Sequence, residues 1–160
     1  MIQNPLPGIQ HLQNVHPLAV HFPIAFLVGS ALFYLLALLI SRETMATTAF
    51  SLLIAGTLGA AAAVGTGIYA EPSVILAPSV RGHLLEKHED LMILTLCVSA
   101  ILAIWATIAR PFPKKGRALF VLLLFALLGV MSIGADYGAR MVYDYNAGGH
   151  ACPQPIEFVK

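Results

Sequence analysis

Charged residues are scarce in this chain. Only 11% of its 160 residues are Asp, Glu, Lys or Arg, whereas 58% are hydrophobic, and the mean hydropathy is +0.81. Because soluble domains carry roughly 25% charged residues, this composition excludes an ordinary soluble protein. Residues 22–40 contain no charged side chain at all, and an apolar run of about 20 residues is long enough to cross a bilayer.

Other absences narrow the possibilities further. No basic residue precedes Arg42, so the positive segment of a secretory signal peptide is missing and we expect the first apolar run to be retained. No CxxCH motif occurs, which excludes covalent attachment of a c-type haem. The two cysteines, Cys97 and Cys152, fall within a span and in the C-terminal tail. We therefore expect membrane depth to keep them apart.

Four apolar segments predict an all-α membrane protein. They cover about 18–40, 47–69, 88–109 and 118–137, and residues 138–160 form a C-terminal tail. The connections are short, so an antiparallel, up-down four-helix bundle is expected, with the whole chain as one domain. On the second span, Ala55, Gly59, Ala63 and Gly67 recur every four residues. Such a stripe of small side chains favours close helix packing in lipid.

Basic residues are concentrated in two of the connections. The 41–46 and 110–117 connections carry five Lys or Arg against one acid, a net charge of +4. The opposite side carries four Lys or Arg against seven acids, a net charge of −3. Because positively charged loops stay in the cytoplasm, both termini and the 70–90 connection are predicted to lie outside. This orientation places all six histidines on the outer side of the membrane.

Histidines stand in two pairs at the outer ends of spans. His16 and His21 begin the first span and His83 and His88 precede the third, and the members of each pair are five positions apart. On a helix this offset separates two side chains by about 140° around the axis, so each helix is expected to give one ligand to a shared cofactor. Two imidazoles from facing helices suit a b-type haem. We expect His21 and His88, the deeper members, to be its axial ligands.

Neighbouring polar residues are expected to support this site. His16 and His83 lie further out, as partners of the axial ligands, contacts of the haem propionates, or ligands of another haem. Arg140 and Arg81 stand on the same side of the membrane and are candidates for neutralising the propionates. The predicted cofactor-binding residues are therefore the four paired histidines and these two arginines.

The segment from His16 to Ile24, which reads HPLAVHFPI, resembles the opening signature of a large, poorly characterised family of bacterial four-helix inner-membrane proteins. Members of that family also have a histidine at the start of the third span, as at His88, and a Gly-rich tail with Val and Tyr, as at Val142 and Tyr143. The resemblance covers nearly the whole chain. It implies the fold, the site and a location in the bacterial inner membrane, but no particular activity.

Together these features predict a haem-binding membrane subunit that relays electrons between the quinone pool and an outward-facing redox partner. That partner would be a larger redox complex or a periplasmic cytochrome, and a quinone is a second candidate ligand. No histidine lies in the inner half of any span, so the chain cannot hold a ladder of haems across the roughly 30 Å hydrocarbon core. Membrane lipids are the remaining expected partners, and nothing indicates nucleic acid.

Other interpretations of the histidines stay open. They could bind Zn²⁺ or copper, relay protons, or merely cap helices, as the position of His16 before Pro17 would allow. A further alternative is a purely structural subunit whose small-residue stripe packs against a larger enzyme. His11 and His150 lie in polar termini and are expected to be solvated.

Overall fold

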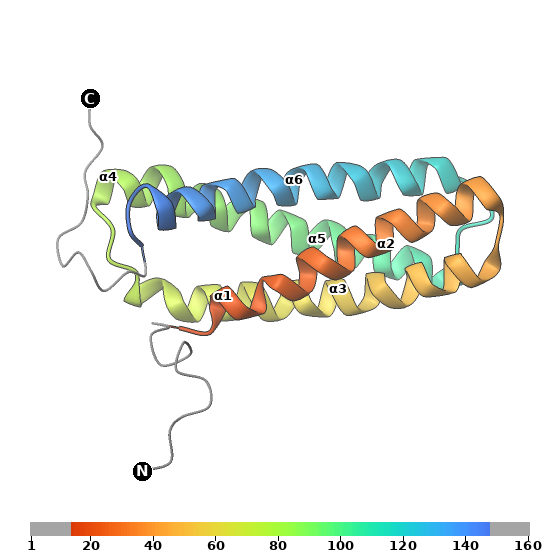
Figure 1. Cartoon of the computed structure of the whole chain (residues 1–160), viewed down its shortest axis with the longest axis horizontal. Helices are drawn as coiled ribbons and strands as arrows, with labels where there is room; N and C mark the ends of the chain where they lie inside the picture. The colour runs from red at the N-terminus through yellow and green to blue at the C-terminus, as the bar shows by residue number, and fades with distance from the viewer. Residues whose placement is uncertain (1–13, 148–160) are drawn as a thin grey trace, which may run out of the picture.

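Long helices account for most of the chain. The structure is a computed structural model and describes residues 14–147. Within that range it is all-helical, without strands, which confirms the predicted fold class. The long helices pack side by side in an up-down bundle (Figure 1). They are α2 (His21–Ile40), α3 (Glu43–Ala70), α5 (Glu86–Ile108) and α6 (Arg117–Tyr143).

Short helical turns complete the end of the bundle where α1 lies. The four-residue helix α1 (His16–Ala19) precedes α2, and the helix is interrupted at Val20. A 3-10 turn η2 (Glu71–Ser73) follows α3, and α4 (Pro78–Val80) leads through the π-helical turn η3 (Arg81–Leu85) into α5. A proline occupies one of the first two positions of α1, η2 and α4. Its missing N–H costs nothing there, because an N–H at the start of a helix has no partner within the helix.

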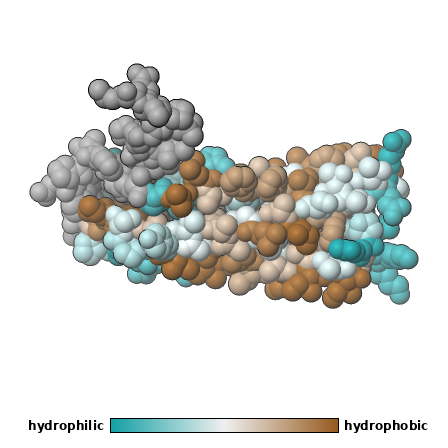
Figure 2. Space-filling model, turned by 90° about the horizontal axis from the view of Figure 1, so that it is seen from below, coloured by the Kyte–Doolittle hydropathy of each residue, from teal (hydrophilic) through white to brown (hydrophobic). Residues whose placement is uncertain are grey.

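Four helical segments of the described chain are long and apolar enough to cross a membrane. They are His16–Ile40, Glu43–Ser73, Pro78–Ile108 and Arg117–Tyr143. Each extends beyond the predicted span at one end or both, because the helices include polar residues that flank the apolar run. In Figure 2 the middle of the visible face is largely hydrophobic, whereas hydrophilic residues gather at the end that holds the α2–α3 and α5–α6 connections.

Helices α2 and α3 lie in close contact at two glycines of α3. A Cβ atom built on Gly56 would lie 2.8 Å from Cδ2 of Leu27, and one built on Gly59 would lie 3.1 Å from the backbone nitrogen of Pro23. The absence of side chains therefore permits this contact, as expected for helices that associate in lipid. Ala63 of the predicted stripe is also buried, whereas Ala55 lines a surface groove.

An aromatic cluster closes the end of the bundle opposite α1. The ring of Tyr34 on α2 lies 5.0 Å from that of Phe112 and 4.9 Å from that of Phe120. Its hydroxyl donates a hydrogen bond of 2.9 Å to the carbonyl oxygen of Pro111. Tyr34 thus links α2 to the connection between α5 and α6. Trp105 of α5 also packs edge-on against Phe120.

Candidate functional site

His16 reaches from α1 to the backbone of α3. Its Nδ1 atom lies 2.9 Å from the carbonyl oxygen of Ala63 and 3.3 Å from Oγ1 of Thr66. The Thr66 hydroxyl donates its own proton to carbonyls of α3, so toward His16 it acts as an acceptor. The side chain of Asn14 accepts a hydrogen bond of 3.1 Å from the backbone N–H of His16 and so fixes the start of α1.

His88 repeats this arrangement in the second half of the chain. It lies on the first turn of α5, and its Nδ1 atom is 2.8 Å from the carbonyl oxygen of Gly134 on α6. Each histidine therefore stands at the start of one helix and contacts a carbonyl of the helix that follows it. The sequence separations are nearly equal, at 47 residues for His16 to Ala63 and 46 for His88 to Gly134.

These contacts fix the tautomer of both rings. A carbonyl oxygen can only accept a hydrogen bond, so the proton of each neutral imidazole is on Nδ1 and the lone pair is on Nε2. Metal-ligating histidines characteristically donate their second ring N–H to a carbonyl or carboxylate in this way, which orients the ring and raises its basicity. Both side chains are half-buried.

Glycines make room for the two rings. A Cβ atom on Gly67 would lie 3.1 Å from Cε1 of His16, and one on Gly138 would lie 2.9 Å from Cε1 of His88. Each glycine follows the accepting carbonyl by four residues, so it lies one helical turn further along the same face. Any other residue type there would push the imidazole away from the carbonyl.

The two imidazoles lie next to each other. Their ring centroids are 6.3 Å apart and their planes are nearly perpendicular, at 85°. In Figure 1, α1 and the end of α3 occupy one side of this end of the bundle, and α5 and α6 occupy the other. The ring pair therefore joins the two helical hairpins, which each supply one histidine, one carbonyl and one glycine.

The structure thus pairs His88 with the outer histidine rather than with His21. His21 is exposed, and the ring contact recorded for His88 within residues 14–147 is with His16. The expected pairing of the two deeper histidines does not match this geometry. The side chain of His16 faces the carbonyl of Ala63, and that of His21 diverges from it around the axis. The ligand role of His21 stays a prediction.

The remaining predicted site residues, His83, Arg81 and Arg140, lie on η3 and α6. His83 is exposed on η3. Arg81 is bound by the side chain of Glu71 at 2.7 Å and by the carbonyl oxygen of Val74 at 3.2 Å. Arg140 is 3.5 Å from the carboxylate of Asp144. The residues that the structure describes do not include His11, His150 and Cys152.

The number of available ligand residues limits which metal ion or cofactor the site could bind. Within residues 14–147, no cluster of three or more His, Cys, Asp or Glu side chains is placed to bind a metal ion. A structural or catalytic zinc site needs three or four protein ligands. A haem iron needs two, because the porphyrin fills its other positions. Within residues 14–147 neither Nε2 atom has a hydrogen-bond partner, and two such histidines fit a haem better than a bare divalent ion.

Sequence reasoning did not identify the groups that hold the rings. The carbonyls of Ala63 and Gly134 carry no side-chain signal, and Gly67 could be read only as part of a packing stripe. A usable signal does exist, since both accepting residues are followed after four positions by glycine. A comparison of the two halves of the chain would have matched Ala63 and Gly67 with Gly134 and Gly138.

Fold and site together define a four-span helical membrane protein with one histidine from each helical hairpin meeting at one end. The chain belongs to the DUF2231 family, described as a predicted membrane protein family, whose pattern matches residues 12–151. This agrees with the expected membership of a poorly characterised membrane-protein family. No curated protein and no solved structure shows a significant match to the chain.

Proposed function

We propose that this protein is a b-type haem-binding subunit of the bacterial inner membrane that relays electrons between the quinone pool and an outward-facing redox partner. The pairing of His16 with His88 is the observation that carries the proposal. Both rings keep Nδ1 occupied by a backbone carbonyl, which leaves two Nε2 lone pairs as the available ligand atoms.

The separation of the rings is compatible with both histidines binding the iron of one haem. With metal–imidazole bonds of about 2.0–2.1 Å, two such imidazoles would have centroids roughly 6 to 6.5 Å apart. The distance between the rings of His16 and His88 is 6.3 Å.

The position of the pair supports an exchange of electrons at one membrane surface. Both rings are half-buried and lie at one end of the bundle, near enough to the surface for a quinol or a docked protein to approach. When bound, haem would supply the one-electron chemistry, and the protein would tune it through ligands and burial. His16 and His88 would bind the iron, while Ala63 and Gly134 hold the ring protons in place.

Arg81 and Arg140 are the proposed partners of the haem propionates. Each now contacts a carboxylate, Glu71 or Asp144, and a propionate would offer the same charge and geometry. With the predicted orientation, both termini are periplasmic, and a larger redox complex or a periplasmic cytochrome would meet this face.

The absorption spectrum of the purified full-length protein tests the proposal. Reduced-minus-oxidised spectra of protein from haem-replete cells should show a low-spin b-type haem. His16→Ala and His88→Ala should each abolish that signal, whereas His21→Ala, which changes an exposed histidine at the same end, should retain it. Circular dichroism and gel filtration would establish that all three variants are folded.

Two results would contradict the haem site. A colourless wild-type protein would exclude haem binding, and loss of the signal in His21→Ala alone would show that the wrong pair had been chosen. Zinc or copper found by elemental analysis, and lost together with His16 and His88, would favour a metal-ion protein instead.

A further inference from the structure

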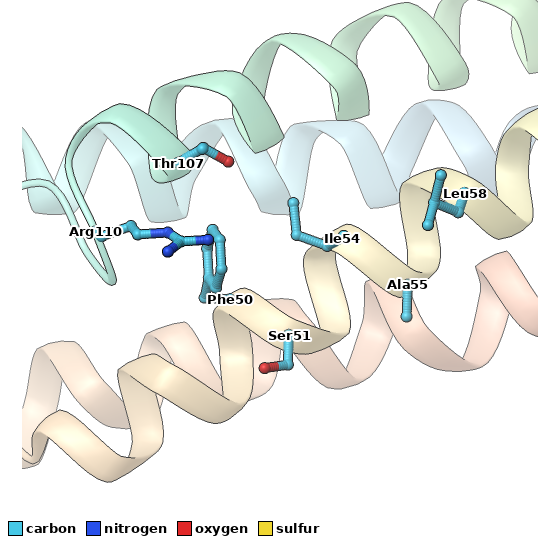
Figure 3. A pocket seen from close by; sticks show the side chains of 7 residues that line it. All are labelled: Phe50, Ser51, Ile54, Ala55, Leu58, Thr107 and Arg110. Carbon is cyan, nitrogen blue, oxygen red and sulfur yellow. The ribbon is translucent and has the colours of Figure 1, made fainter.

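A surface groove lies between α3 and α5, toward the end of the bundle opposite the histidine pair (Figure 3). Its volume is about 420 Å³, and most of it is open to the surroundings of the bundle. Phe50, Ile54 and Leu58 line it from α3 over eight residues, which corresponds to a length of about 12 Å. The long wall of the groove is therefore apolar.

One cation stands at the end of this apolar wall. Arg110 follows α5, and its guanidinium lies 5.0 Å from the centroid of the Phe50 ring, close enough for a cation–π contact. Figure 3 shows this side chain reaching over Phe50. Arg110 is exposed, and no carboxylate pairs with it within residues 14–147.

The two hydroxyl groups that line the groove already donate hydrogen bonds to backbone carbonyls. The hydroxyl of Ser51 donates to the carbonyl oxygen of Thr47 at 3.1 Å, and that of Thr107 donates to the carbonyl oxygen of Ala103 at 2.7 Å. The Arg110 guanidinium, with five N–H groups, is therefore the donor left for a ligand. An occupant should combine an anionic head with an apolar chain.

We propose that this groove is a binding site for one anionic phospholipid, with its phosphate on Arg110 and an acyl chain along Phe50, Ile54 and Leu58. Four other basic residues stand at this end of the chain, in the α2–α3 and α5–α6 connections and at the start of α6, against a single acid. Basic pockets of this kind between membrane helices recognise anionic lipid headgroups. A zwitterionic lipid would bind this site more weakly, because its own cationic group repels the arginine.

A quinone is the weaker candidate for this groove. A neutral quinone gives the unpaired guanidinium no charge partner. The groove is also far from the histidine pair, because Thr107 lies nineteen residues after His88 on the same helix, a rise of about 28 Å. This inference is therefore independent of the proposed haem.

Native mass spectrometry of the detergent-purified protein tests the lipid site. Phosphatidylglycerol and phosphatidylcholine with identical acyl chains would be titrated separately, and the wild type should prefer phosphatidylglycerol. Arg110→Gln should weaken phosphatidylglycerol binding about fivefold, as expected for one lost cation near an anionic lipid. Arg42→Gln removes a basic residue at the same end that does not line the groove, and it should change binding less than twofold.

The groove itself is tested by Ala55→Phe, which fills it without changing charge. This variant should weaken the binding of both lipids. Equal losses in Arg42→Gln and Arg110→Gln would show a diffuse surface charge and overturn the site. Equal binding of the two lipids by the wild type would also overturn it, as would unchanged binding in Ala55→Phe or displacement of the lipid by an equimolar short-chain ubiquinone.

Discussion

The imidazole of His16 lies against the backbone of Gly67, so close that a Cβ atom there would stand 3.1 Å from Cε1. The same relationship joins His88 to Gly138, at 2.9 Å. In each case the glycine permits the ring to reach a carbonyl one turn earlier on the same helix. The glycines are therefore expected to matter for the site and not only for helix packing.

Alanine at these glycines should disturb the histidine pair without unfolding the bundle. In Gly67→Ala and Gly138→Ala the new methyl group would push the ring away from its carbonyl, with the larger effect at Gly138 because the gap is smaller. We expect a weakened or shifted haem absorption in both variants, measured by reduced-minus-oxidised spectroscopy of protein purified in parallel with the wild type.

Two other glycines on the same helices provide matched controls. A Cβ atom on Gly65 of α3 or Gly129 of α6 would meet nothing within 4 Å. Gly65→Ala and Gly129→Ala should therefore keep the wild-type spectrum, and should raise stability by up to about 1 kcal/mol because alanine favours the helix. Equal spectral changes in all four variants would show that the contacts with the two rings are irrelevant.

Much of the fold could be predicted from the sequence because bilayer thickness fixes the length of apolar helices. The helix ends could not, since α3 begins at the polar Glu43 and α5 continues back through a π-helical turn. The end of the bundle that holds the histidines was also predictable. The partner of His88 was not, because it depends on a backbone carbonyl at Ala63 and on the direction of α1 before the interruption at Val20.

Tyr34→Phe should destabilise the protein modestly. The variant keeps the ring between Phe112 and Phe120 but removes the hydroxyl that donates to the carbonyl oxygen of Pro111. The loss of one such hydrogen bond costs about 1 kcal/mol, and more where the acceptor is left unsatisfied. Thermal unfolding in detergent, followed by circular dichroism, should show a lower midpoint.

Tyr143→Phe is the control for that change, because Tyr143 is 85% exposed and loses its hydroxyl at the surface. Its unfolding midpoint should equal that of the wild type. If Tyr34→Phe behaves in the same way, the hydrogen bond to the α5–α6 connection does not contribute to stability.

The charge asymmetry predicts which side of the membrane holds the histidine pair. The connections with net charge +4 should be cytoplasmic, and the end with His16 and His88 should face outward. Alkaline phosphatase, which is active only outside the cytoplasm, should be active when fused after Lys160 and inactive when fused after Lys115 in the α5–α6 connection. The opposite result at both positions would place the histidine pair on the cytoplasmic side. Haem ligation by His16 and His88 could then still hold, but the outward-facing redox partner would be excluded.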